Sequence, residues 1–567
     1  MALFNHKKYK TFTPPSNPNR KWPNKTIKEP PIFGSVDLRD GNQALKNPLN
    51  VEQKLEYFNL LLKIGFKEIE IGFPAASKDD YNFARTLVEK KYIPDDVVIQ
   101  VITQAKEELI ERTFSALKGA KKAIIQIYHS TSKIQREKVY NYSVPTLINL
   151  AKDAAKKIVD LSKNYPETEW TFAYGLESFS ATETDVSIAI CNAVTEVWLQ
   201  NANQKVMINL PTTLEMATPN VFADQVEIFI NNINKRENVI ISVHTHNDRG
   251  TAVAAAELAC LAGADRVEGT LLGIGERAGN MDIITMAMNL YSQGIDPYLD
   301  LSNIMDTTKF VEKHTENITH PRHPYIGELV YSAFSGGHQY SIQKYLNDYK
   351  FGDIWECPYL SIDPQDLGRS YDEVIRINSQ SGKSGIKFIL EEKYGLILPK
   401  WLQANFYRIV QNYTEKTEAE ISEELIWSLF YDQYIKSKMS EEIKAFFASY
   451  DTRYQRLQLA LNDSLNSDNE LNHLDEITPK FKEIFYEDFE IISMFSHHIG
   501  KNHENKYICY LKILCEGTQH YTAAISNTLK KAELFAIENA ILSHLSLKIG
   551  LEYDKYCEMN NEQIVSH

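Results

Sequence analysis

The stretch VHTHNDRGTAVAAAELACLAGADRVEGTLLGIGERAGN, residues 243–280, decides the fold of this chain. An apolar run ends there in His244 and His246, which point to the same face of a strand because side chains alternate along it. An alanine-rich helical segment, a second short strand (Arg266–Thr270) and a glycine-rich turn ending in Asn280 follow. Two imidazoles at a strand end suggest a divalent metal site. A bare H-x-H pattern, however, more often consists of ordinary polar loop residues.

The same alternation of strand and helix extends back to residue 32 and predicts an α/β fold, a (β/α)8 TIM barrel. Eight such repeats in about 260 residues are typical of this barrel, whereas an open doubly wound sheet has fewer strands. An open sheet would also need a glycine fingerprint after its first strand, and LRDGNQ (residues 38–43) stands there instead. The predicted strands are Ile32–Asp37, Glu68–Gly72, Val97–Ile102, Ala123–Tyr128, Trp170–Tyr174, Lys205–Leu210, Val239–His244 and Arg266–Thr270. The helical patterns include Val51–Ile64, Glu107–Leu117, Val144–Leu161, Asp185–Leu199 and Thr251–Leu261.

Composition narrows the classes of function. With 567 residues, 43% of them hydrophobic and 24% charged, the chain has an ordinary globular balance and room for about two to four domains. A formal net charge of -14 argues against nucleic-acid binding, which needs a basic face. Six scattered cysteines include no C-x-x-C pair, which indicates a reducing compartment. No membrane span and no secretory signal are predicted, so we expect a cytoplasmic protein.

Four regions are predicted along the chain. They are an extended N-terminal arm (1–31) that could lie on a partner subunit, the catalytic barrel (32–299), helical and linker subdomains (300–435) and a divergent small α+β C-terminal domain (436–567). After the barrel, the expected elements are helical stretches at Asp300–Leu346 and Pro399–Ile435, a linker at Asp353–Ser384, a polar helix-like stretch at Ser440–Glu490, and one ββα unit at Tyr507–Leu514, His520–Ile525 and Leu529–Leu545.

The C-terminal ends of the barrel strands carry a set of polar side chains, and catalytic residues of such barrels lie at these ends. Every predicted strand except the second, which ends in GFP (residues 72–74), contributes to this rim. Loops are polar in any protein, but Arg, Asp, Glu and two His on one rim indicate a site. The groups are Arg39, Asp40, Thr103, Gln104, Tyr128, Glu177, Pro211, Thr213, His244, His246 and the turn from Gly273 to Asn280.

Some of these groups form a candidate metal site. Asp40, His244 and His246, with Asn280, would provide oxygen and nitrogen ligands for Mg, Mn or Zn acting as a Lewis acid. Arg39, directly before Asp40, is placed to stabilise an oxyanion that the metal also polarises.

Two further features complete a possible reaction. Glu177 is a candidate acid or base, with a surface loop carboxylate as the alternative. The turn with Gly273, Gly275, Glu276 and Arg277 lies after strand eight, where barrels often bind phosphate. Together these groups suggest carbon–carbon bond chemistry on an oxo acid with a phosphate-bearing second substrate.

Longer motifs point to a known family. They are SVDLRDGNQAL (35–45), EIEIGFPAAS (68–77), INLPTTLEMATPN (208–220), HTHNDRGTAVAAAEL (244–258), GIGERAGN (273–280), RHPYIGELVYSAFSGGHQ (322–339) and PYLSIDPQDLGRSY (358–371). From about Lys8 to about Tyr434 the chain resembles the long-chain 2-isopropylmalate synthase family of barrel acyl-CoA condensing enzymes. The resemblance implies an acyltransferase that condenses acetyl-CoA with 2-oxoisovalerate to 2-isopropylmalate, in leucine biosynthesis.

The resemblance also implies residue roles. Asp40, His244 and His246 would bind a divalent metal with Asn280 in or near its ligand shell, and Arg39 would contact the carbonyl oxygen of the 2-oxo acid. The acceptor would be bound by Ile102, Gln126, Tyr128, Gly175, Asn209, Pro211 and Thr213, with Thr213 on its carboxylate, and the acetyl-CoA co-substrate by Gly273, Gly275, Glu276 and Arg277.

Proton transfer would involve residues from outside the barrel. Glu177 would act with His338 and Tyr359, although His338 alone could equally be a loop histidine. Because residues 322–371 cannot belong to the same barrel, His338 and Tyr359 are expected to reach over a barrel mouth, such as that of a partner in a homodimer.

The chain departs from the family pattern at three positions of the site. It has Gln126 where the family usually has His, Gly175 where it has Ser, and Ile274 where it has Asn. The first two changes predict an acceptor preference shifted toward a longer 2-oxo acid, and the third predicts weaker acetyl-CoA contacts.

The C-terminal region departs as well. Only one of two expected ββα units is readable there, so leucine feedback could be altered or absent. KKAELFAIENAI (residues 530–541) after two strands is also similar to a double-stranded-RNA-binding fold, which the acidic charge disfavours. A barrel that has lost catalysis and serves as a sensor is the non-enzymatic alternative.

Overall fold

The computed structural model describes residues 12–200, 205–350, 352–371, 383–417, 421–436, 489–499 and 506–564, with a few positions between 455 and 483. The chain divides into two compact units, and each is described by itself. Unit 1 comprises Met1–Val330 and Pro364–Arg369, and unit 2 comprises Tyr331–Asp363 and Ser370–His567. The boundaries of the four regions expected from the sequence stay a prediction.

Unit 1 contains a closed barrel of eight parallel strands that pair in sequence order, and β1 closes the ring by pairing with β8. The predicted (β/α)8 barrel is therefore confirmed. The strands form because β-branched, continuously apolar runs suit a parallel sheet that is buried on both faces. They are β1 (Ile32–Ser35), β2 (Glu68–Glu70), β3 (Val98–Gln104), β4 (Lys122–Ser130), β5 (Glu169–Glu177), β6 (Val206–Thr212), β7 (Val239–Thr245) and β8 (Arg266–Gly269).

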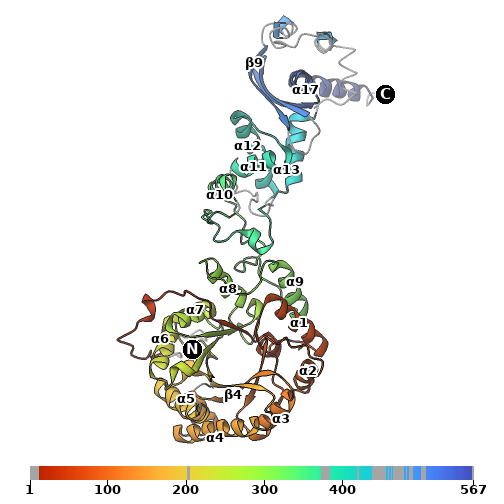
Figure 1. Cartoon of the computed structure of the whole chain (residues 1–567). Coiled ribbons are helices and arrows are strands. Elements are labelled where there is room, and N and C mark those ends of the chain that lie inside the picture. The colour runs from red at the N-terminus through yellow and green to blue at the C-terminus, as the bar shows by residue number, and fades with distance from the viewer. Residues whose placement is uncertain are drawn as a thin grey trace. The chain divides into compact units, whose positions relative to one another are not determined.

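Eight helices surround these strands in a ring (Figure 1). Helix α1 shows how the sequence sets the two ends of such a helix. Asn50 caps it by accepting a hydrogen bond from the backbone of Gln53, and Gly65 ends it with a φ of 110°, a conformation that favours glycine. The helices are α1 (Val51–Ile64), α2 (Lys78–Glu89), α3 (Glu107–Leu117), α4 (Val144–Ser162), α5 (Thr184–Trp198), α6 (Pro219–Asn232), α7 (Ala252–Ala262) and α8 (Ile283–Tyr291).

The strand ends differ by one to three residues from the sequence prediction, and the differences at β1, β4 and β5 bear on the site. Strand β1 stops at Ser35, and Asp37–Gly41 forms a single π-helical turn that carries Arg39 and Asp40. Strands β4 and β5 continue beyond their predicted ends, and their register places Ser130 opposite Glu177. Glu177 is thus part of a barrel strand and not of a flexible loop.

The N-terminal arm packs on its own chain. Arg20 and Trp22 donate hydrogen bonds of 2.7 and 2.9 Å to Asp224, and Asn17 donates one of 3.0 Å to Glu227. Both acceptors lie on α6 and are almost fully buried. Residues 17–22 thus contact α6 of their own chain, and the expected placement of the arm on a partner subunit stays a prediction; residues 1–11 lie outside the described part of the chain.

Two separate helices replace the expected continuous helical stretch Asp300–Leu346. Helix α9 (Ile304–Thr315) belongs to unit 1 and α10 (Gly336–Asp348) to unit 2, with turns between them. The interruption follows from Pro321, Pro324 and Gly327, because proline lacks a backbone N–H and glycine disfavours helix. Most of the residues at the centre of the predicted linker Asp353–Ser384 lie outside the described residues.

Unit 2 continues with helices α11 (Lys383–Tyr394), α12 (Lys400–Thr417) and α13 (Glu423–Phe430), as the sequence predicts for Pro399–Ile435. Apolar side chains of these helices, such as Phe406 and Phe430, share one core with Ile508 and Tyr510 of the C-terminal sheet. The helices and the sheet of unit 2 are therefore packed on each other.

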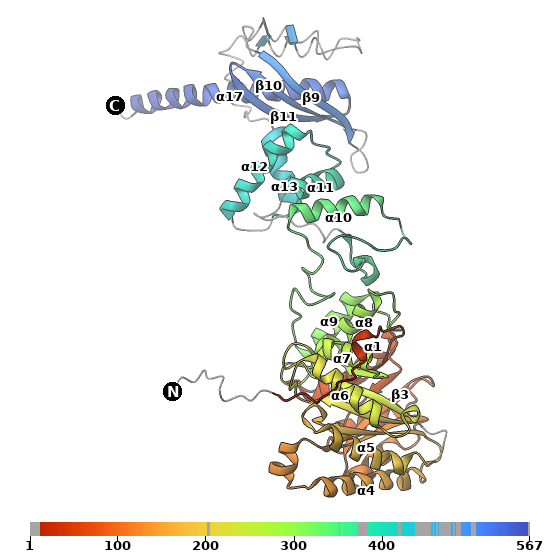
Figure 2. The same cartoon turned by 90° about the vertical axis from the view of Figure 1, so that its left-hand side faces the viewer.

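The C-terminal sheet has three antiparallel strands in the order β11-β10-β9, and α17 (Leu529–Ile564) lies along it (Figure 2). Strands β10 (Lys506–Cys515) and β11 (Thr518–Ser526) with α17 match the predicted ββα unit. Strand β9 (Phe489–Ile499) was not predicted, because its polar residues Ser493, Ser496, His497 and His498 hide the apolar alternation. Most of the expected helix-like stretch Ser440–Glu490 lies outside the described residues. Of the helices that the structure describes, none is long and apolar enough to cross a membrane.

Candidate active site

A cavity of about 580 Å³ opens at the C-terminal ends of the barrel strands. All seven residues predicted to bind the acceptor line it, together with most of the predicted catalytic and metal-binding groups of the barrel. These lining residues are Arg39, Asp40, Ile102, Gln126, Tyr128, Gly175, Glu177, Asn209, Pro211, Thr213, His244, His246, Glu276 and Arg277. Phe73, Ala76, Ser77 and Asp80, which follow β2, line the cavity as well, so the expectation that the second strand does not contribute is wrong. Residues at all eight strand ends, or in the segments that follow them, thus surround one space.

Asp40, His244 and His246 converge closely enough to bind one metal ion. Oδ2 of Asp40 lies 3.6 Å from Nε2 of His244 and 3.7 Å from Nε2 of His246, and the two Nε2 atoms are 3.3 Å apart. All three side chains are buried, yet Oδ2 of Asp40 has no hydrogen-bond partner. A buried carboxylate oxygen without a partner is costly unless a cation compensates it. One carboxylate and two imidazoles therefore fit a divalent metal.

The pKa values of Asp40, His244 and His246 bear on their ability to act as metal ligands. Burial raises the pKa of Asp40, but the charges of Arg39 and His244 outweigh it and hold that pKa well below its usual range. Burial, together with the charge of His244, lowers the pKa of His246 to about 4. Burial also lowers the pKa of His244, but the nearby carboxylates of Asp40 and Glu268 raise it to about 9 overall. Asp40 is thus an anion and His246 is neutral, and a metal held by this cluster would take the place of a proton on His244.

Asn280 lies beside this cluster. Its backbone pairs with that of His246, its Nδ2 donates a 3.0 Å hydrogen bond to the carbonyl of Ile274, and its Oδ1 is buried without a partner. An oxygen with a free lone pair next to the histidines is consistent with the expected fourth ligand.

Arg39 is held rigidly next to Asp40. Its Nε donates a 2.8 Å hydrogen bond to Glu70, and its Nη1 donates one of 2.6 Å to Asp40. Burial lowers the pKa of Arg39, but the charges of Glu70 and Asp40 raise it above its usual value, so the guanidinium stays charged. A cation fixed beside the metal ligands can stabilise an oxyanion. Glu70 was missed by the sequence analysis, although EIEI on a buried strand was the available signal.

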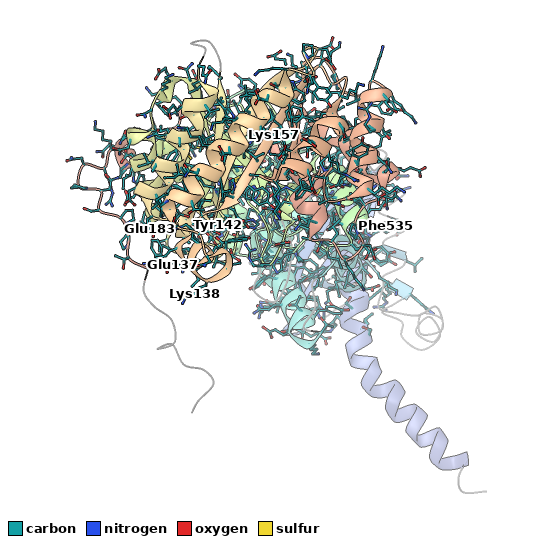
Figure 3. All side chains as sticks on the ribbon, turned by 90° about the horizontal axis from the view of Figure 1, so that it is seen from below. Glu137, Lys138, Tyr142, Lys157, Glu183 and Phe535 are labelled. Carbon is teal, nitrogen blue, oxygen red and sulfur yellow. The ribbon has the colours of Figure 1, made fainter. Side chains whose placement is uncertain are left out.

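Glu177 accepts a hydrogen bond from the hydroxyl of Ser130, its register partner on β4. Ser130 precedes the loop after β4, and Glu177 precedes the loop after β5. Arg136 of the first loop donates hydrogen bonds of 3.0 and 2.9 Å to Glu183 of the second and so links the two loops. Figure 3 labels Glu183 on the segment after β5 and Tyr142 on the segment after β4. The hydroxyl of Ser130 thus orients the carboxylate at the cavity, and Ser130 is a further residue that the sequence analysis missed.

The glycine-rich turn forms one wall of the cavity through its side chains. Arg277 donates a 2.7 Å hydrogen bond to Asp248, and both Glu276 and Arg277 line the cavity. Gly273 and Gly275 are not among the lining residues. Gly279 has a φ of 102°, and a side chain there would collide with the carbonyl of Gly273. Gly273 and Gly275 thus shape the turn. Glu276 and Arg277 line the cavity.

Two features of this turn bear on its expected contacts, which stay a prediction. Asp282 caps α8, the helix after the turn, and accepts hydrogen bonds of 3.1 Å from the N–H groups of Ile284 and Thr285. Ile274 is not a lining residue, and its carbonyl accepts hydrogen bonds from Thr270 and Asn280. Ile274 acts through its backbone.

His338 and Tyr359 lie in unit 2 and stack on each other, with ring centroids 3.8 Å apart and planes 16° from parallel. Tyr359 is 62% exposed and has a φ of 67°, a strained conformation for a residue other than glycine. The structure thus assembles the two predicted residues into one exposed pair in unit 2.

Comparisons with known proteins agree with this picture. Residues 31–311 match the family model described as HMGL-like, and residues 328–391 match the one described as alpha-isopropylmalate synthase, post-catalytic domain-like. A 2-isopropylmalate synthase from Alcanivorax borkumensis is 45% identical over 95% of this chain and 97% of its own length. One from Parvibaculum lavamentivorans is 53% identical over 76% of each chain. Among solved structures, an HMG-CoA lyase from Bacillus subtilis aligns with a TM-score of 0.42 and 18% identity over 51% of this chain and 95% of its own.

Proposed function

Because the chain belongs to the 2-isopropylmalate synthase family, we propose that the cavity at the barrel rim condenses acetyl-CoA with a 2-oxo acid. The chain is an acyltransferase of leucine biosynthesis, and 2-oxoisovalerate is the acceptor that gives 2-isopropylmalate. The observation that carries the assignment is the cluster of Asp40, His244 and His246 beside Arg39, with Glu177 on the same cavity. No observation favours a sensor barrel without catalysis.

The acceptor would be held at one end of the cavity by this chain's own residues. Asp40, His244 and His246 would bind a divalent metal, which supplies Lewis-acid polarisation of the acceptor carbonyl. Arg39 is placed to donate hydrogen bonds to the carbonyl oxygen as negative charge develops on it. The hydroxyl oxygen of Thr213 accepts a 2.9 Å hydrogen bond from the Ser178 backbone, which leaves its proton available for the acceptor carboxylate.

The carbon–carbon bond would form after removal of a proton from the acetyl methyl group. Glu177, oriented by Ser130, is our candidate for the base. The resulting enolate carbon attacks the carbonyl carbon, the alkoxide takes up a proton, and water hydrolyses the thioester to release CoA. His338 and Tyr359 are candidates for the proton transfers of the later steps.

The acceptor is tested by measuring CoA release with a thiol reagent. Purified protein is given acetyl-CoA with 2-oxoisovalerate, 2-oxobutyrate or 4-methyl-2-oxopentanoate. We expect the highest kcat/KM with 2-oxoisovalerate; a higher value with 4-methyl-2-oxopentanoate would instead support the shift predicted from Gln126 and Gly175. No CoA release with any 2-oxo acid would contradict the proposed function. Repeating the assay after chelation and reconstitution with magnesium, manganese or zinc identifies the active ion.

Replacing Gly175 by serine is expected to narrow the acceptor end of the cavity. A Cβ atom at this position would lie 3.3 Å from Cβ of Tyr128 and 3.4 Å from Nε2 of Gln126, so the neighbours would have to move. We expect kcat/KM for 2-oxoisovalerate to fall by about 10-fold, and by more for 4-methyl-2-oxopentanoate, within the range of about 10- to 200-fold for such pocket contacts. The KM for acetyl-CoA serves as the internal control, and an equal loss for all acceptors would contradict a role in acceptor choice.

We further propose that the protein is a cytoplasmic homodimer in which His338 and Tyr359 of one subunit complete the barrel site of the other. The stacking of the two side chains on each other supports a shared role for them. Mixing His338→Ala with Glu177→Ala subunits is expected to restore up to about a quarter of the parent activity, since half of randomly mixed dimers have one intact site of two. Restored activity should grow with mixing time after dissociation, and its absence in verified mixed dimers would exclude a shared site.

A further inference from the structure

Glu268 lies in the interior of the barrel, on β8, and both of its carboxylate oxygens are occupied. Oε1 accepts hydrogen bonds from Gln100, at 3.0 Å, and from the guanidinium of Arg266. Oε2 accepts hydrogen bonds from Asn209, at 2.8 Å, and from Nδ1 of His244, at 3.1 Å. Glu268 is 1% exposed, so no solvent competes for these four positions. The carboxylate is therefore saturated by fixed donors.

This arrangement decides which nitrogen of His244 is available as a ligand. Donors surround the carboxyl group of Glu268 at all four positions, so the group only accepts hydrogen bonds, including the one from His244. Nδ1 of His244 must then carry a proton. The other nitrogen, Nε2, faces Oδ2 of Asp40 at 3.6 Å and keeps its lone pair for a metal when the ring is neutral.

We propose that Glu268 is a positioning residue that fixes the ring of His244 with Nε2 directed at the metal and thereby strengthens metal binding. The inference rests on the proposed metal site of Asp40, His244 and His246. Metal-binding histidines commonly donate their second ring N–H to a carboxylate, and loss of such a partner lowers metal affinity by about 10- to 100-fold.

Arg266 makes a buried carboxylate possible at this position. Its guanidinium is fully buried and donates hydrogen bonds to Glu268, to Gln100 at 2.9 Å and to Ser242 at 2.9 Å. Its Nε also donates to Glu68 on β2. Glu68 shares Arg266 with Glu268 but, among the described residues, forms no hydrogen bond or ion pair with His244 or Asp40. It is therefore the matched control for loss of a carboxylate beside this arginine.

The same carboxylate reaches the acceptor end of the cavity. The Nδ2 group of Asn209 that donates to Glu268 also donates a 3.2 Å hydrogen bond to Oε1 of Gln126, which lines the cavity. One buried group thus orients a metal ligand and, through Asn209, a wall of the acceptor pocket. Asn209→Ala removes this link while leaving the bond between Glu268 and His244.

Metal dissociation constants of the full-length chain test the proposal. Chelator-treated parent, Glu268→Gln and Glu68→Gln proteins are titrated with Zn²⁺ and with Mn²⁺ in competition with a chromophoric chelator. We expect Glu268→Gln to raise the Kd for the bound ion by about 10- to 100-fold, and Glu68→Gln and Asn209→Ala to leave it within about threefold. Equal Kd values for parent and Glu268→Gln would overturn the role of Glu268, whereas a parent that binds neither ion would overturn the metal site itself.

A second variant keeps the test decisive if Glu268→Gln does not fold. Glu268→Asp retains the charge beside Arg266 but shortens the side chain by one methylene, which withdraws the carboxylate from His244. Circular dichroism of the metal-free protein verifies folding. We expect a Kd at least severalfold higher than that of the parent, and an unchanged Kd in folded Glu268→Asp protein would overturn the proposal.

Discussion

Asp40→Asn is expected to lower kcat/KM for the condensation by on the order of a thousandfold or more and to abolish tight metal binding. Asparagine keeps the size of the side chain but removes the anionic oxygen that lies between His244 and His246. It also removes a charged partner of Arg39. A metal Lewis acid contributes several kcal/mol to such a reaction, and each 1.36 kcal/mol corresponds to a tenfold change in rate. CoA release and metal content of the purified protein measure the two effects.

Asp37→Asn is the matched control for this variant. Asp37 lies on the same π-helical turn and is equally buried, but it does not line the cavity. Burial raises the pKa of Asp37 to about 7, so a neutral amide is close to a state that the site already accommodates. We expect this variant to bind metal and to keep its activity within about tenfold of the parent. Full metal binding by Asp40→Asn would contradict the proposed ligand set.

Glu177→Gln is expected to lower kcat by about 10²- to 10⁴-fold with little change in the KM for either substrate, as for loss of a general base. The amide oxygen can still accept the hydrogen bond from the hydroxyl of Ser130, but the amide cannot take up a proton from the acetyl methyl group. Exchange of that group's protons with deuterium from solvent should fall in parallel with kcat. This exchange reports the first proton transfer separately from carbon–carbon bond formation.

Glu183→Gln is the control for a change of charge in the same region. Glu183 holds Arg136 and the loop after β4 but does not line the cavity. We expect its effect on kcat to stay below about tenfold, because a partly exposed ion pair contributes little. If Glu177→Gln retained normal exchange of the methyl protons, the base would have to be another residue, and His338 would be the next candidate.

The barrel could be predicted from the sequence because its strands are buried on both faces. Runs such as Ala123–Tyr128 and Val239–His244 are β-branched and apolar throughout, and they alternate regularly with amphipathic helices. Once the strands were counted, the position of His244 and His246 at the end of a strand followed directly. The residues at the strand ends could therefore be predicted to lie close together, and the structure places them around one cavity.

Groups inside the barrel could not be predicted in the same way. Glu70 ends β2 and Glu268 lies within β8. A charged residue in a strand is usually interpreted as facing solvent, and only the tertiary structure pairs these two with Arg39 and Arg266. Ser130 was missed because the ends of β4 and β5 depend on their pairing with each other. Strand β9 was missed for a similar reason, since its pairing with β10 compensates its weak alternation.

The contacts of the N-terminal segment have a practical consequence for making shorter versions of this protein. A gene fragment that starts at the first barrel strand would look complete by its strand count. It would nevertheless lack Asn17, Arg20 and Trp22. The buried carboxylates of Asp224 and Glu227 would then lose the hydrogen bonds that these residues donate to them. Removing the partners of a buried charge is strongly destabilising. Truncations and cleavable tags are therefore best placed before Asn17, so that residues 17–22 keep their hydrogen bonds to α6.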